Sequence, residues 1–89
     1  MNFKEIVRDV LLTEAKELEK TANKISFDIE KAIDLIVNSK GKLIVTGVGK
    51  SGLVGAKIAA TLASTGTSSF FLHPTEAMHG DLGMIGKED

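Results

Sequence analysis

The sequence KLIVTGVGKSGLVGAKIAATLASTGTSSFFL, residues 42–72, predicts an α/β fold. It begins with a short β-branched apolar run, residues 42–46, which is typical of a strand buried in a parallel sheet. The glycine-rich turn Gly47–Gly52 follows, and residues 53–64 carry several small side chains that let a helix pack closely on a sheet. Residues 68–72 predict a second strand. Such a strand–loop–helix–strand unit leaves its two strands parallel.

The first forty residues of the chain predict two helices. They contain neither glycine nor proline, and apolar side chains recur at helical spacing from Ile6 to Leu18 and from Ile25 to Ile36, with a polar break near residues 21–23. The expected fold class is therefore α/β, with two N-terminal helices followed by a β-α-β unit. Because two parallel strands alone leave both sheet edges open, we expect the first part of a doubly wound parallel sheet.

The composition excludes several classes of function. The 89 residues include eleven basic and twelve acidic side chains, a net charge of −1, so no basic excess is available to bind nucleic acid. The absence of cysteine excludes a disulfide scaffold, a thiolate nucleophile and a cysteine-ligated metal. No apolar run is long enough to span a membrane, and the N-terminus lacks the apolar stretch of a secretory signal, so we expect a cytoplasmic protein.

Two nucleotide-binding motifs are matched only in part. Gly47-x-Gly49-x-x-Gly52 has the spacing of the dinucleotide fingerprint, but the acidic residue expected about twenty positions later is absent, since His73 and its neighbours stand there. The Gly-Lys-Ser sequence resembles the end of a P-loop, yet that motif needs a glycine where this chain has Ile44. The dinucleotide interpretation is therefore disfavoured, and the P-loop interpretation is rejected.

The glycine-rich turn still has the chemistry of an anion site. A turn between a strand and a helix start brings backbone amides and the positive end of the helix dipole to a ligand. Lys50 adds a cation and Ser51 a hydroxyl, and Gly49 and Gly52 let the backbone approach closely. These features favour a small sugar phosphate as ligand.

A second polar segment follows the second predicted strand. If Pro74 begins a helical turn, Glu76 and His79 share one face, and the carboxylate could orient the imidazole. A Glu-x-x-His pair can also bind a metal, but it supplies two ligands where three or four are usual, so we expect no metal.

Other residues of this segment are expected to have structural roles. We predict that His73 packs or hydrogen-bonds and that Asp81 caps a turn. Met78, Phe70 and Phe71 are expected in the core.

Four segments together resemble the D-arabinose-5-phosphate isomerases of the KpsF/GutQ type, members of the sugar isomerase (SIS) superfamily. The resemblance is dense over residues 41–86, and the combination of segments is specific to that branch. The segments are VTGVGKSG (45–52), KIAATLASTGT (57–67), FFLHP (70–74) and EAMHGDLGM (76–84).

The resemblance implies interconversion of D-arabinose 5-phosphate and D-ribulose 5-phosphate, which feeds the synthesis of 3-deoxy-D-manno-octulosonate (Kdo), a sugar of lipopolysaccharide and some capsules. Family members are typically cytoplasmic homo-tetramers with a SIS domain and two CBS domains. Residues 1–89 would then be the N-terminal part of a single SIS domain, with a helical region over 1–40 and the β-α-β region over 41–89.

The resemblance also implies roles for single residues, with no metal or cofactor. Lys50 would polarise the carbonyl or neutralise developing charge, and His79 would act in ring opening or proton transfer, oriented by Glu76 or Asp81. The expected catalytic residues are Lys50 and His79, and the expected substrate-binding residues are Gly49, Ser51, Gly52 and Glu76.

The chain departs from the family pattern in two ways. Leu53 stands where the family commonly has histidine, and the sequence ends at Asp89, before the family's serine-rich second phosphate loop, a further glutamate and histidine, and the CBS domains. We therefore expect the isolated chain to be inactive. One alternative is a non-catalytic module that senses a sugar phosphate, and another is an incomplete, inert fragment.

Overall fold

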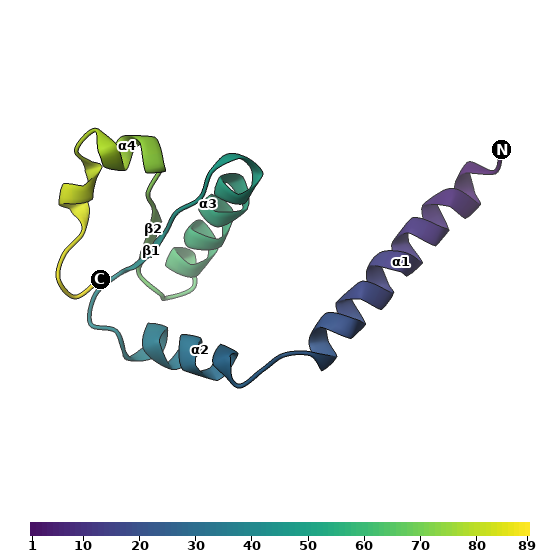
Figure 1. Cartoon of the computed structure of the whole chain (residues 1–89), viewed down its shortest axis with the longest axis horizontal. Helices are drawn as coiled ribbons and strands as arrows, with labels where there is room; N and C mark the ends of the chain where they lie inside the picture. The colour runs from purple at the N-terminus through teal and green to yellow at the C-terminus, as the bar shows by residue number, and fades with distance from the viewer. The chain divides into compact units, whose positions relative to one another are not determined.

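The elements follow the predicted order in the computed structural model, which describes all residues from Met1 to Asp89. Strands β1 and β2 are parallel, with Val45 paired with Phe71, and α3 connects them, so the predicted α/β class and β-α-β unit are confirmed (Figure 1). The elements are α1 (Phe3–Asn23), α2 (Asp28–Asn38), β1 (Leu43–Val45), α3 (Gly49–Ser64), β2 (Ser69–Phe71), α4 (Pro74–Met78) and a 3₁₀ helix, η1 (Asp81–Met84).

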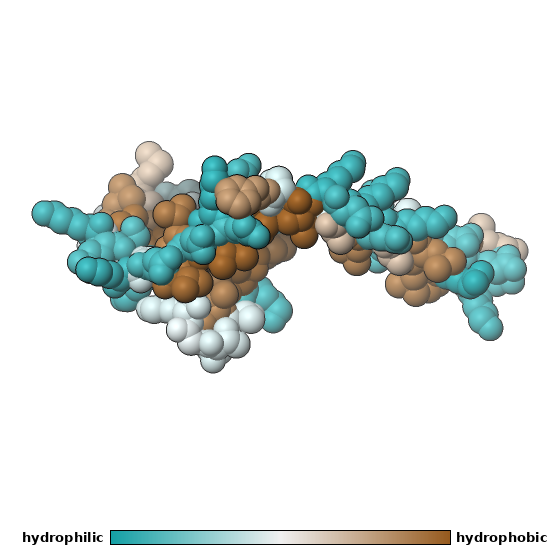
Figure 2. Space-filling model, turned by 90° about the horizontal axis from the view of Figure 1, so that it is seen from below, coloured by the Kyte–Doolittle hydropathy of each residue, from teal (hydrophilic) through white to brown (hydrophobic).

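The chain divides into two compact units, Met1–Ala32 and Ile33–Asp89, with the boundary inside α2. In the first unit, the Asn2 side chain caps α1 by accepting a hydrogen bond from the Glu5 amide at 3.2 Å. Apolar side chains gather along one side of α1, at the right of Figure 2, and no residue of the helix is buried. No helix in the structure has both the length and the apolar character needed to cross a bilayer.

The polar break that we predicted near residues 21–23 lies slightly further along the chain. Helix α1 continues to Asn23, because the Thr21 hydroxyl donates to the Glu17 carbonyl at 2.9 Å and the Lys24 amide donates to the Thr21 carbonyl at 3.0 Å. The Thr21 hydroxyl thus bonds back into the helix, and the Lys24 amide provides a partner for one of the free carbonyl groups of the last turn. These polar residues therefore belong to the end of the helix and do not interrupt it.

Helix α3 packs on the two-stranded sheet through a face of small residues. Gly52, Gly55 and Ala59 are its buried positions. A Cβ at Gly55 would lie 3.0 Å from a methyl carbon of Val45 and 3.4 Å from the ring of Phe71. The helix thus approaches the sheet closely because this face carries almost no side-chain volume, which confirms the close packing expected from the small residues of this helix.

The core of this unit is small and centred on the start and end of β2. Ala59 and Leu72 are 3% and 5% exposed, and the Ser69 hydroxyl donates to the Ala59 carbonyl at 2.6 Å. Phe70 and Phe71 are half-buried. The prediction that Met78 is a core residue is wrong: its side chain is 88% exposed, because the five-residue α4 packs on η1 and not on the sheet.

The last residues return to the beginning of β1. The Asp89 carboxylate accepts hydrogen bonds from the Lys42 amide and the Gly86 amide, each at 2.8 Å. The bond from Lys42, followed by that from Gly86, lowers the pKa of the Asp89 carboxyl below its usual 3.8. The end of the segment that follows β2 is therefore hydrogen-bonded to the residue that precedes β1.

This hydrogen-bonded carboxylate should make the stability of the fold depend on pH. Since the pKa of Asp89 is depressed in the folded state, the carboxylate stabilises the fold above the unfolded-state pKa, and that contribution is lost as pH falls through the folded-state pKa. We expect an NMR titration of the Asp89 carboxyl carbon to have its midpoint below 3.8. Asp89→Asn should destabilise the chain at neutral pH and match the wild type in strong acid. A midpoint at or above the usual value would contradict this account.

Candidate functional site

The carboxyl ends of the two strands are joined by hydrogen bonds. The Leu72 amide donates to the Val45 carbonyl at 2.8 Å, and the Thr46 hydroxyl donates to the Leu72 carbonyl at 2.6 Å. The glycine-rich turn begins directly after Thr46, and the titratable segment begins directly after Leu72. Both candidate segments therefore start from adjacent points, and α4 and the first turn of α3 lie at the same end of the strands (Figure 1).

The glycine-rich turn is shorter than predicted. Helix α3 begins at Gly49, so Lys50, Ser51 and Gly52 lie in its first turn and not in a loop. The early start has a backbone cause: Val48 is extended, with φ −115° and ψ 145°, and Gly49 then takes a φ of +62°, which a glycine adopts without strain. Glycines favour loops in sequence patterns, so the pattern placed this helix start too late.

The start of α3 has two features that disfavour a helix. Its N-cap is Val48, whose side chain has no oxygen to accept from the free amides of the first turn, and there is no acidic residue in that turn. Lys50 instead puts a cation beside the positive end of the helix dipole. Lys50 and Ser51 are both exposed, and the one ion pair of the chain joins Lys20 and Glu17, so the Lys50 charge is unpaired.

Gly52 shapes this turn from the inside. It is buried, and a Cβ at this position would lie 2.6 Å from the Gly47 carbonyl oxygen and 3.4 Å from the Phe71 ring. Only a hydrogen atom fits there, so the backbones of Gly47 and Gly52 lie in direct contact within the turn. Leu53, which follows, is 74% exposed.

The titratable segment begins with a short helix, as its proline predicts. Pro74 occupies the first turn of α4, and His73 is the N-cap, with its Nδ1 accepting a hydrogen bond from the Thr75 amide at 3.1 Å. The predicted hydrogen-bonding role of His73 is confirmed. Glu76 lies in the first turn, and His79 follows the helix as its C-cap.

The side-chain contact predicted between the two candidate site residues of this segment, Glu76 and His79, is not made. The His79 amide donates to the Glu76 carbonyl at 3.1 Å, but both side chains are exposed and no hydrogen bond joins the carboxylate to the imidazole. The prediction that Asp81 caps a turn is also wrong. Gly80, with φ +122°, is the N-cap of η1, and no side chain caps that helix.

The structure thus forms two local groups at one end of the sheet. Lys50, Ser51 and Gly52 share the first turn of α3, whereas Glu76 and His79 lie on α4 and at its end. No hydrogen bond or ion pair links the two groups, and no three His, Asp or Glu side chains come together as a metal site.

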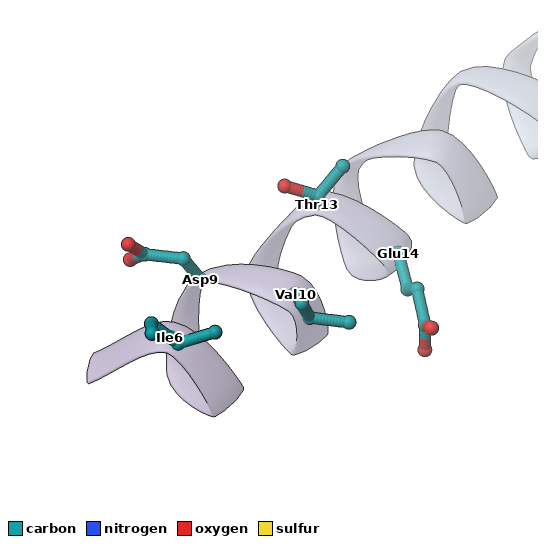
Figure 3. A pocket seen from close by; sticks show the side chains of 5 residues that line it. All are labelled: Ile6, Asp9, Val10, Thr13 and Glu14. Carbon is teal, nitrogen blue, oxygen red and sulfur yellow. The ribbon is translucent and has the colours of Figure 1, made fainter. Parts of the chain in front are cut away.

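A shallow depression on α1 lies outside these groups. It is formed by one helix alone, and its side chains point outward around an open surface (Figure 3). None of the predicted site residues lines it. The lining residues are Ile6, Asp9, Val10, Thr13 and Glu14.

Curated relatives match nearly the whole chain. A "Probable arabinose 5-phosphate isomerase" of Haemophilus influenzae is 52% identical over 85 residues, which cover 96% of this chain and 25% of that protein. Arabinose 5-phosphate isomerase GutQ of Escherichia coli K12 is 50% identical over 82 residues, 92% of this chain and 26% of that protein. The chain therefore spans about a quarter of the length of these relatives.

A solved structure supports the same relationship. The structure of E. coli CFT073 c3406 in complex with arabinose 5-phosphate superimposes with a TM-score of 0.86 at 41% identity, covering 100% of this chain and 49% of that one. The family model described as the SIS domain matches residues 35–89, which include both strands, α3 and both candidate segments. The chain therefore belongs to the SIS domain family.

Proposed function

We propose that this chain forms the N-terminal part of the SIS domain of an aldose–ketose isomerase that interconverts D-arabinose 5-phosphate and D-ribulose 5-phosphate. Two curated relatives that carry the name arabinose 5-phosphate isomerase support this proposal, at 52% and 50% identity. The structural neighbour whose complex contains arabinose 5-phosphate supports the same substrate.

One observation carries the proposal furthest: the uncapped first turn of α3. The Val48 side chain gives the free amides no partner, and Lys50 places an unpaired cation where it opposes the helix dipole. A bound phosphate would relieve both effects, because it accepts hydrogen bonds from the amides and its negative charge offsets the repulsion between the cation and the helix dipole. The Lys50 side chain itself is then left to reach the reacting end of the sugar. Natural chains break local rules of this kind mainly at functional sites.

The reaction needs a base, a charge-stabilising group and groups that bind the phosphate. In the open-chain aldose, a base removes the proton from C2, and the electron pair moves onto O1 as an enediolate. A proton moves from the O2 hydroxyl to O1, and the proton returned to C1 then leaves the ketose carbonyl at C2. In our proposal Lys50 stabilises the negative oxygen of the enediolate, and His79 acts in ring opening or proton transfer. Gly49, Ser51, Gly52 and Glu76 would bind the substrate.

The proposed function can be tested in a chimera. The 82 residues of E. coli GutQ that match this chain would be replaced by the chain itself, and conversion of arabinose 5-phosphate would be measured. We expect the chimera to catalyse the isomerisation, whereas GutQ without that segment should not. A folded chimera that binds arabinose 5-phosphate without converting it would instead favour a non-catalytic sensor of the sugar phosphate.

A substitution at the N-cap separates helix stability from ligand binding. Val48→Asp should raise the free energy of unfolding by about 0.5–2 kcal/mol, because aspartate caps the free amides and the valine is 72% exposed. The same substitution should weaken phosphate binding, since its carboxylate competes for those amides and repels the anion. Urea unfolding and calorimetry with arabinose 5-phosphate measure the two effects. The uncharged cap of Val48→Ser should give a smaller loss of binding, and tighter binding in Val48→Asp would contradict the proposed phosphate position.

We further propose that the complete protein acts in the cytoplasm as a homo-oligomer, a tetramer by its resemblance to the family, and that its product feeds Kdo synthesis. The support is the identity to the arabinose 5-phosphate isomerases. Light scattering on the chimera measures the assembly, and a monomer would contradict this part of the proposal.

A further inference from the structure

The two strands separate at their carboxyl ends one hydrogen bond earlier than their register allows. The Leu43 amide donates to the Ser68 carbonyl at 2.9 Å. At the other end of the pair, the Leu72 amide donates to the Val45 carbonyl at 2.8 Å. In a parallel ladder such bonds alternate between the strands, so the Leu72 carbonyl would next accept from the Gly47 amide. That bond is missing, because the Gly47 amide donates no hydrogen bond within the chain.

A side chain takes the place of the missing amide. The Thr46 hydroxyl donates to the Leu72 carbonyl at 2.6 Å, a short and favourable distance between two oxygen atoms. Leu72 is 5% exposed, so its carbonyl needs a partner within the protein. Because the hydroxyl supplies that partner, the backbone can leave the sheet at Gly47, and the Gly47 amide stays free.

The path of the chain after Thr46 decides where the first turn of α3 lies. A Cβ at Gly52 would lie 2.6 Å from the Gly47 carbonyl oxygen, so the two backbones are in contact. The Gly47 backbone therefore cannot move toward β2 without displacing the first turn of α3, which carries Lys50. The carbonyl that accepts the Thr46 hydroxyl directly precedes the segment that carries His79. One hydroxyl thus sets the position of the two candidate segments relative to each other.

We infer that Thr46 is a positioning residue for the isomerase reaction, whose hydroxyl holds the first turn of α3 and the segment after β2 where Lys50 and His79 act on one substrate. The inference rests on the proposed function, because it takes the roles of those two side chains from it. Thr46 acts through the Leu72 carbonyl and does not contact the substrate. Small displacements matter in such a site, since a misplacement of about 1 Å can lower a rate by about 10²-fold.

Thr46→Val tests the hydroxyl in the chimera with E. coli GutQ. Valine keeps the β-branched shape but cannot donate, so the Leu72 carbonyl takes the Gly47 amide and the turn moves toward β2. We expect kcat to fall by about 10- to 100-fold, because His79 is then misplaced relative to Lys50. KM should change by less than about threefold, because the free amides and Lys50 move together with α3. Thr46→Ser keeps the hydroxyl and should retain most of the turnover.

Ser69→Ala is the matched control at the opposite end of the sheet. The Ser69 hydroxyl also donates to a backbone carbonyl at 2.6 Å, that of Ala59, and Ser69 is the first residue of β2. Its removal should lower the thermal midpoint about as much as Thr46→Val does. It should leave kcat unchanged, because no candidate site residue lies at that end of the strands. An equal fall of kcat in both variants would overturn the inference, since lost stability would then explain the effect.

Hydrogen exchange in the whole chain measures the structural step without an assay of activity. NMR should show a Gly47 amide that exchanges rapidly in the wild type and in Thr46→Ser, and more slowly in Thr46→Val. A Gly47 amide that is already protected in the wild type would overturn the inference, because the hydroxyl would then not have replaced it in the ladder.

The kinetic outcomes separate failure of this inference from failure of the proposed function. Full turnover of Thr46→Val in an active parent chimera would overturn the inference and leave the proposed function intact. A folded parent chimera that does not convert arabinose 5-phosphate would overturn both.

Discussion

Replacing Lys50 by alanine in the chimera with E. coli GutQ is expected to lower isomerase turnover by about 10²- to 10³-fold, the usual loss when a group that stabilises an oxyanion is removed. Lys50 is exposed in the first turn of α3, and its charge is unpaired within the chain. Its removal should therefore leave the thermal midpoint unchanged or slightly higher, because a cation is unfavourable at a helix N-terminus. A steady-state assay and a melting curve measure both quantities.

Three further variants identify the cause of this loss. Lys50→Met keeps most of the aliphatic stem without the charge and should be as slow as alanine, whereas Lys50→Arg should retain part of the activity. Lys57→Ala removes another exposed lysine of the same helix, away from its first turn, and should leave turnover unchanged. Normal turnover in Lys50→Ala would remove Lys50 from the catalytic residues.

Gly52→Ala should have the largest effect on stability, a decrease of about 1–3 kcal/mol in the free energy of unfolding. The added methyl carbon would lie 2.6 Å from the Gly47 carbonyl oxygen, a backbone atom that cannot turn away as a side chain can. The start of α3 must then move away from the sheet, and the free amides and Lys50 move with it. Urea unfolding followed by circular dichroism measures the decrease.

Two other glycines provide matched controls. A Cβ at Gly83 has no atom within 4 Å, and its φ is not positive, so Gly83→Ala should change the free energy of unfolding by no more than about 0.5 kcal/mol. Gly49→Ala is also unobstructed, but the φ of +62° should make it about 1–2 kcal/mol less stable through backbone strain alone. Equal stability of Gly52→Ala and Gly83→Ala would contradict the close approach described for Gly52.

The order of the elements could be predicted because each has a local cause. The β-branched run at residues 42–46 is typical of a strand, and the small-residue stretch after Gly52 is typical of a helix that packs on a sheet. The structure confirms a parallel β-α-β unit there. The candidate segments were found for the same reason: glycines, a lysine and histidines at strand ends have a chemistry that does not depend on distant contacts. The catalytic roles of Lys50 and His79 remain predictions.

The errors arose where a distant contact, or its absence, outweighed a local preference. Met78 is apolar, yet it is exposed because the short α4 packs on η1 and not on the sheet. The His79 imidazole and the Glu76 carboxylate share a helical spacing, but spacing alone does not make a hydrogen bond between exposed side chains.

The sequence by itself determines the α/β class, the parallel strands and the presence of two polar segments at strand ends, because short-range periodicity and turn chemistry encode these features. Tertiary structure was needed to show that the Thr46 hydroxyl and the Leu72 carbonyl join the origins of those segments, that α3 starts at Gly49, and that the His73 Nδ1 caps α4. These features depend on atoms that are brought together by packing of α3 on the sheet, and no local pattern in the chain specifies such distances.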